Sequence, residues 1–118
     1  MDYQYKSTKS LLERQNEANS IIGKYPLRIP IICEKDQNSL IPDIQKKKYL
    51  VPYDMTVSQF SFIIRRKLEL AKEAALFLLV NGKVSIVGNQ TMSEVYENHK
   101  DTEDGFLYIT YTSQLTWG

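Results

Sequence analysis

The chain carries three copies of a helix-start pattern, and their positions set the order in which helices and strands can follow one another. Each copy is a Ser or Thr followed three residues later by Glu or Gln, at 10–13, 56–59 and 91–94. In such a capping box the hydroxyl accepts a hydrogen bond from the third backbone N–H, and the Glu or Gln side chain reaches back to the first. The pattern predicts helices over about 11–22, 57–70 and 92–99, with the first ending at Gly23 before Pro26.

Segments rich in β-branched and aromatic residues lie between and after these helices. They predict strands at 28–34, 49–52, 77–80, 83–87 and 106–111. The dipeptide Asn81-Gly82 favours a tight hairpin between the third and fourth strands. Pro30 has no N–H for a ladder, so it indicates an edge position or a strand start. The element order is that of an α+β ubiquitin-like β-grasp, with helices on one face of a mixed sheet and a leading helical extension.

Length and charge exclude several broad classes of protein. A chain of 118 residues is one domain, in which we expect N-terminal helices over 1–25, a β-grasp core over 26–111 and a flexible tail over 112–118. A net charge of +1 weakens nucleic acid as a partner, and the longest apolar run, seven residues from 74 to 80, is too short to span a bilayer. The run Lys46-Lys47-Lys48 is either a solvated loop or a basic rim beside a groove for an acidic peptide or an anionic lipid surface.

A catalytic or metal site is not indicated by the reactive residues. Cys33 alternates with Ile29 and Ile31, which is typical of a buried structural thiol, and His99 falls near a predicted helix end. One cysteine and one histidine without a spaced carboxylate cluster do not make a metal site. We therefore expect no enzyme, no catalytic residue, no metal and no cofactor. An enzyme that uses Cys33 remains as an alternative, and it requires an exposed thiol.

The chain ends in Thr116-Trp117-Gly118, behind a strand and a short polar tail. A terminal glycine is either an ordinary frayed end or a carboxylate that is activated. Without a side chain, such an end can enter a narrow channel, be adenylated, pass to a cysteine as a thioester and finish as an amide. On a β-grasp domain the second interpretation is favoured.

Five stretches together resemble one known family. They are 28–35 (RIPIICEK), 47–52 (KKYLVP), 55–57 (MTV) with 59–60 (QF), 64–66 (IRR) and 104–108 (DGFLY). In this order they are similar to the autophagy-related protein eight family of ubiquitin-like modifiers, relatives of GABARAP and of the light chain of microtubule-associated protein. The resemblance covers nearly the whole chain and implies a ubiquitin-like β-grasp with two N-terminal helices.

The resemblance also implies a function and its partners. Gly118 would be coupled covalently to phosphatidylethanolamine, which would move the protein from the cytoplasm to the autophagosomal membrane as a lipid-anchored peripheral protein. The implied partners are the activating and conjugating enzymes of the pathway, a deconjugating cysteine protease, and receptors with aromatic-x-x-aliphatic motifs. The alternative is a ubiquitin-like scaffold that binds peptides or tubulin and is never conjugated.

The resemblance further implies two pockets for the peptide motif. An aromatic pocket would comprise Glu17, Ile21, Pro30, Ile32, Lys48, Leu50 and Phe106, and an aliphatic pocket would comprise Tyr49, Val51, Pro52, Met55, Phe60 and Ile63. Arg28, Lys46 and Lys67 would contact acidic residues that flank the motif. The alternation along 28–34 agrees with this arrangement: Pro30 and Ile32 face away from the core side, so that face is expected to be available to a ligand.

Overall fold

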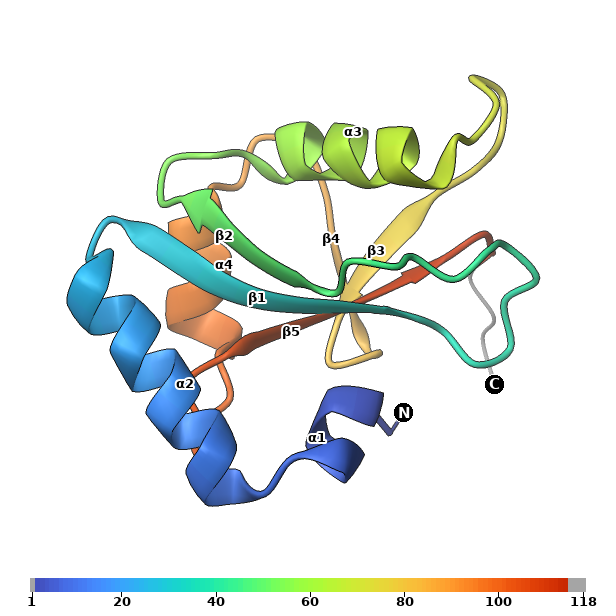
Figure 1. Cartoon of the computed structure of the whole chain (residues 1–118). Coiled ribbons are helices and arrows are strands. Elements are labelled where there is room, and N and C mark those ends of the chain that lie inside the picture. Colours follow the sequence, from blue (N-terminus) through green and yellow to red (C-terminus); the bar gives the residue numbers. More distant parts are fainter. Residues whose placement is uncertain (1, 115–118) are drawn as a thin grey trace.

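The computed structural model describes residues 2–114, and in it one five-stranded mixed sheet carries helices on both faces (Figure 1). The elements along the chain are α1 (Gln4–Thr8), α2 (Leu11–Lys24), β1 (Arg28–Lys35), β2 (Lys48–Pro52), α3 (Val57–Leu68), β3 (Phe77–Val80), β4 (Val84–Ile86), α4 (Met92–His99) and β5 (Leu107–Thr112). The strand order is β2-β1-β5-β3-β4, with β1 and β5 parallel and the other neighbours antiparallel. The predicted α+β β-grasp with an N-terminal helical extension is confirmed.

The predicted helix starts are all present, although one of the three boxes is incomplete. Ser10 and Thr56 each accept from the N–H three residues on and receive the reciprocal bond. Thr91 accepts from the Glu94 N–H at 3.2 Å, but within the described chain Glu94 does not complete the box. Helix α2 continues through Gly23, where the sequence predicts its end, and stops at Lys24. It ends there because Pro26 disfavours helical geometry at Tyr25. Helix α3 ends two residues early, at a left-handed Glu69 with φ 54°.

The edge position predicted for the Pro30 strand is wrong. Strand β1 lies between β2 and β5, near the centre of the sheet. The proline is tolerated because its nitrogen points toward the β5 side, where pairing starts only at Ile31. The Tyr53 N–H donates to Leu27 O (3.0 Å) and the Cys33 N–H donates to Lys47 O (2.8 Å), so the backbone N–H and C=O groups of odd-numbered residues in β1 point toward β2. Those of even-numbered residues, Pro30 among them, point toward β5. Pro30 thus lies near the start of β1, which is the other position predicted for this proline.

The hairpin predicted at Asn81-Gly82 is confirmed. Both residues have positive φ, 55° and 70°, and the Lys83 N–H donates to Val80 O at 3.0 Å. Val80 pairs with Val84, so Lys83 belongs to the connection and β4 is shorter than predicted. Only Gly and a few polar residues such as Asn adopt these backbone angles readily, which is why the dipeptide is a reliable signal.

Two apolar clusters cover opposite faces of the sheet, so the prediction that helices lie on one face is wrong. The larger cluster lies under α3 and α4 and includes Ile31, Cys33, Phe60, Met92 and Ile109. The smaller one lies under α1 and α2, and its members are Tyr3, Tyr5, Ala18, Ile32, Phe106 and Tyr108. Tyr3 and Tyr5, at the start of α1, cover the second face of the sheet. A helix of five residues is too short to show an amphipathic period, so the sequence pattern could not predict this cover.

Specific polar contacts fasten the N-terminal helices to the sheet. The buried Glu34 carboxylate accepts from the backbone N–H groups of Gln4 (2.8 Å) and Tyr5 (3.0 Å), at the start of α1. Asp104, also buried, accepts from Arg14 of α2 and from the Tyr108 hydroxyl, both at 2.6 Å. Buried carboxylates need such partners, because an unpaired one is costly. The helical extension is therefore part of the folded domain.

Two phenylalanines two positions apart on α3 test how far the larger cluster stabilises the fold. Phe60 is 0% exposed and packs edge-on against Tyr49, whereas Phe62 is 59% exposed. We expect Phe60→Ala to lower the free energy of unfolding by about 3–5 kcal/mol through lost burial and a cavity. The control Phe62→Ala should change it by less than about 0.5 kcal/mol. Urea unfolding of both variants measures the difference, and equal losses would contradict the assigned packing.

Candidate functional site

The free edge of β2 presents backbone groups that are not paired with another strand. Because odd-numbered residues of β1 bond to β2, the N–H and C=O groups of Lys48 and Leu50 point away from the sheet. The next outward position is Pro52, which has no N–H, so the open edge is short. An exposed edge of this kind can pair with one additional extended segment.

Arg28 lies beside this edge. Its guanidinium donates to the Leu50 carbonyl oxygen at 3.1 Å from the neighbouring strand. The donor therefore sits where a carboxylate on a docked segment could replace the carbonyl as its acceptor. Of the three predicted flank residues, Arg28 is the one that the structure places directly on the β2 edge.

The predicted aromatic-pocket residues come together between α2 and the β1–β2 pair. Ile21 on α2 packs against the smaller cluster, and Leu50 of β2 is half-buried and pairs with Pro30 in the β1–β2 ladder. Ile32 and Phe106 are 0% exposed, and Pro30 is also buried. The face predicted to be available to a ligand is thus covered by the N-terminal helices. Ile32 and Phe106 belong to the cluster against which Ile21 packs, and none of the three buried residues lines an open surface.

An ion pair bridges the mouth of this region. Lys48 of β2 pairs with Glu17 of α2, and Lys9 approaches the other carboxylate oxygen at 3.6 Å. Burial raises the pKa of the Glu17 carboxyl, but the paired Lys48 ammonium, the nearby Tyr5 hydroxyl and the charge of Lys9 outweigh it and hold the pKa below its usual value. The pair ties α2 to the edge strand and keeps the Lys48 ammonium next to the open edge.

The predicted aliphatic-pocket residues divide into two layers. Pro52, Met55 and Ile63 line a hollow of about 490 Å³ between the end of β2 and α3, which is completed by Asp54, Ser58, Gln59 and Phe62. Tyr49, Val51 and Phe60 are buried beneath it in the larger cluster. Sequence reasoning missed Phe62, although a large apolar residue on the polar side of an amphipathic helix is a signal that could have found it.

The three lysines at 46–48 do not behave as one solvated run. Lys46 lies 5.1 Å from the ring centroid of Tyr49, Lys47 donates to the Gln4 side chain, and Lys48 pairs with Glu17. Each ammonium is therefore held near the N-terminal half of the domain or the β2 edge. Lys67, the last predicted flank residue, lies farther away on α3, where it lines a hollow of about 350 Å³ with Ile63 and Arg66.

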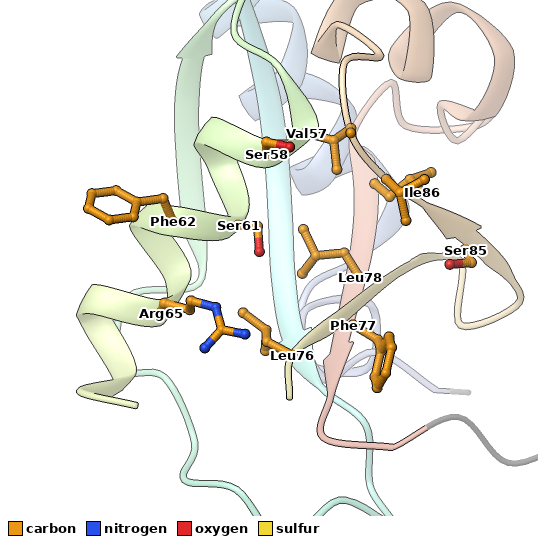
Figure 2. A pocket seen from close by; sticks show the side chains of 12 residues that line it. Val57, Ser58, Ser61, Phe62, Arg65, Leu76, Phe77, Leu78, Ser85 and Ile86 are labelled. Atoms are coloured by element: carbon orange, nitrogen blue, oxygen red, sulfur yellow. The ribbon is translucent and has the colours of Figure 1, made fainter. Parts of the chain in front are cut away.

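Another hollow lies on the opposite side of α3, between that helix and β3–β4 (Figure 2). Its volume is about 290 Å³, and its lining includes Ser58, Phe62, Arg65, Leu76 and Ile86. None of the predicted site residues lines it. Phe62 and Ser58 border both this hollow and the one beside Met55, so α3 forms the ridge between them.

The chemistry expected of a Cys33 enzyme is not supported. Cys33 is 0% exposed in the larger cluster, and burial raises the pKa of its thiol, so the reactive thiolate is disfavoured. Over residues 2–114 there is no group of three or more His, Cys, Asp or Glu side chains placed to hold a metal ion. The helices within the same range are too short or too polar to cross a bilayer. Gly118 lies outside the described residues.

A β-grasp sheet with one helix packed across it and an open edge strand defines the class of ubiquitin-like proteins. The model of the family described as "Autophagy protein Atg8 ubiquitin like" matches residues 13–118. Autophagy-related protein 8 of Mycosarcoma maydis is 49% identical over 97% of this chain and 95% of that protein. Autophagy-related protein 8e of Arabidopsis thaliana is 48% identical over 97% and 92%.

Similarity extends to a solved structure. The crystal structure of Trypanosoma brucei ATG8 superimposes with a TM-score of 0.90 and 39% sequence identity, covering all of both chains. The chain belongs to the Atg8 family of ubiquitin-like autophagy proteins. The family assignment made from the five sequence stretches is confirmed.

The Glu17 ion pair makes the stability of the domain depend on pH. A carboxyl whose pKa is lowered on folding contributes stability that is present above its usual pKa, 4.5, and is lost as the pH falls through the lower pKa of the folded state. We therefore expect Glu17→Gln to destabilise the protein more at about pH 7 than at about pH 3.

Urea unfolding at the two pH values measures this difference. The matched control is Glu97→Gln, which changes an exposed carboxylate on α4. Its effect should be small at both pH values. A loss in Glu17→Gln that persists unchanged in acid would contradict a stabilising role for the ionised carboxylate.

Proposed function

We propose that the protein is a conjugated autophagy modifier that recruits receptors through aromatic-x-x-aliphatic peptides. The observation that carries the binding half is the open β2 edge, where Lys48 and Leu50 present backbone groups between α2 on one face and α3 on the other. An extended peptide paired with this edge would continue the sheet.

The spacing of the motif fits the two faces of that sheet. Successive side chains of a strand point to opposite faces, so residues i and i+3 of a docked peptide face opposite sides. One side carries Leu50 and, on α2, Ile21, and the other carries the Met55–Ile63 hollow. An aromatic residue followed three positions later by an aliphatic one therefore places one anchor on each face.

Energetics favour a modest affinity. Burying one aromatic and one aliphatic side chain contributes on the order of 3–6 kcal/mol before the cost of ordering the peptide. Arg28 and Lys48 lie beside the edge, so acidic residues that flank the motif add attraction and hasten association. The expected dissociation constant is about micromolar.

Conjugation is the second half of the proposal. Gly118 is the residue that would be adenylated, transferred to cysteine and amidated by phosphatidylethanolamine, with a cysteine protease to reverse the linkage. A lipid with two acyl chains is enough for stable anchoring. The family membership supports this role, and the match to the family model includes Gly118. The protein would then divide between cytoplasm and autophagosomal membrane.

Replacing Leu50 tests whether a peptide adds to the β2 edge. The Leu50 N–H points away from β1, so Leu50→Pro removes the bond offered to the ligand and leaves the β1–β2 ladder intact. We expect Leu50→Pro to weaken an aromatic-x-x-Leu peptide at least about tenfold in titration calorimetry. Leu50→Ala, the matched control for the lost side chain, should weaken it less. Equal affinities of both variants would show that the peptide does not pair with this edge.

Incubation with the family's activating and conjugating enzymes, ATP and phosphatidylethanolamine liposomes tests conjugation. Mass spectrometry should detect the lipid on Gly118, and Gly118→Ala should abolish the adduct because a side chain obstructs the narrow channel. Absence of an adduct, when a known relative is lipidated in parallel, would favour the scaffold that binds peptides or tubulin without conjugation.

A further inference from the structure

One aliphatic side chain is presented to solvent in an unusual way. Leu40, in the loop that joins β1 to β2, is 97% exposed, the highest value of any large apolar side chain among residues 2–114. Its neighbours turn inward: Ser39 is 4% exposed, and Ile41 packs against the larger cluster. A leucine so fully in water has no packing role in the domain.

The loop that carries Leu40 is held rigidly. The Lys35 ammonium donates to Ser39 O at 2.8 Å, and the Ser39 N–H donates to Asp36 O at 3.0 Å. On the other side of Leu40, the Tyr111 hydroxyl donates to Pro42 O (2.9 Å) and accepts from the Ile44 N–H (2.7 Å). These bonds hold the backbone on both sides, so the Leu40 side chain is displayed from a fixed position.

The same loop contacts the start of the C-terminal tail. The Ser113 N–H donates to the Ser39 hydroxyl at 3.2 Å, and the two hydroxyls are also 3.2 Å apart. Four residues, 115–118, follow Gln114. An extended chain spans at most about 3.6 Å per residue, so Gly118 is tethered within roughly 14 Å of Gln114.

We propose that Leu40 inserts into the lipid bilayer to which Gly118 is attached and so orients the domain on the membrane. The inference rests on the conjugation proposed above. Ser113, at the start of the C-terminal tail, is hydrogen-bonded to Ser39, so a bilayer that holds a lipid on Gly118 lies no farther from Ser39 than the length of this tail. Leu40 follows Ser39 in the β1–β2 loop. Removing its side chain from water then stabilises one orientation, with the β1–β2 loop toward the membrane.

A bilayer fits Leu40 better than a protein partner does. Specific protein interfaces bury a wide patch around a central anchor, whereas Leu40 protrudes alone between the polar residues Asn38 and Ser39 and the exposed Pro42. A lipid surface needs no complementary shape. The same β1–β2 connection carries Lys46 and Lys47, and positive charge suits phosphate headgroups at the interface.

The test attaches the full chain to liposomes without the conjugating enzymes, so that it does not depend on whether enzymatic conjugation occurs. Gly118→Cys is coupled to maleimide-bearing phosphatidylethanolamine, while the buried Cys33 stays unreactive. Trp117→Phe removes the single natural tryptophan, and Leu40→Trp then reports on the loop. Lipids brominated at stated depths quench tryptophans that enter the bilayer.

The matched control is Leu27→Trp in the same background. Leu27 is 67% exposed and precedes β1, whose eight residues separate it from the loop by about 26 Å. We expect a blue-shifted emission for Leu40→Trp on tethering, and quenching at least about twofold stronger than for Leu27→Trp. Equal quenching of the two would overturn the proposal. So would a variant that combines Leu40→Asp with Leu27→Trp and is quenched to the same extent as Leu27→Trp alone, because the orientation on the membrane would then not depend on Leu40.

Discussion

Burial of β1 on both of its faces is the constraint on which the rest of the structure depends. Residues 29–34 of this strand are all buried, with Ile31 and Cys33 under α3 and α4 and Ile32 under the N-terminal helices. A strand in this position needs a partner on each edge and a helical layer on each face, because its backbone and its apolar side chains would otherwise meet water. Both partner strands, β2 and β5, and all four helices meet one or other of these needs.

The candidate site is a consequence of this arrangement. With β1 in the interior, β2 becomes an outer strand, and its alternation presents one face to α2 and the other to α3. Apolar side chains therefore flank the open edge on both faces, Ile21 and Leu50 on the α2 side and the Met55–Ile63 hollow on the α3 side, and the spacing of an aromatic-x-x-aliphatic motif corresponds to that geometry. The lysines and Arg28 add a positive rim, which makes the edge more selective than an apolar edge strand.

The N-terminal extension and the β1–β2 loop are fastened to the domain by the same kind of contact. Buried or half-buried polar groups of β1 and β5, among them Glu34 and the Tyr111 hydroxyl, bind backbone groups of the segments that lie over them. These hydrogen bonds hold the backbone of both segments in a fixed position on the sheet. The first closes the second face of the sheet, and the second holds Leu40 in water beside the tail that leads to Gly118.

The sequence by itself determined what depends on near neighbours along the chain. The capping boxes at Ser10 and Thr56 and the Asn81-Gly82 turn act over a few residues, and Cys33 shows its burial by alternation. Only the tertiary structure decided the central place of β1, the cover over Ile32, and the burial of Tyr49 and Phe60 beneath the aliphatic hollow. These features arise from contacts between segments far apart in the chain, such as Tyr3 with Thr110. The spacing of apolar residues within one segment does not predict such contacts. The free energy of burial depends on which side chains from distant segments pack on each face of the sheet.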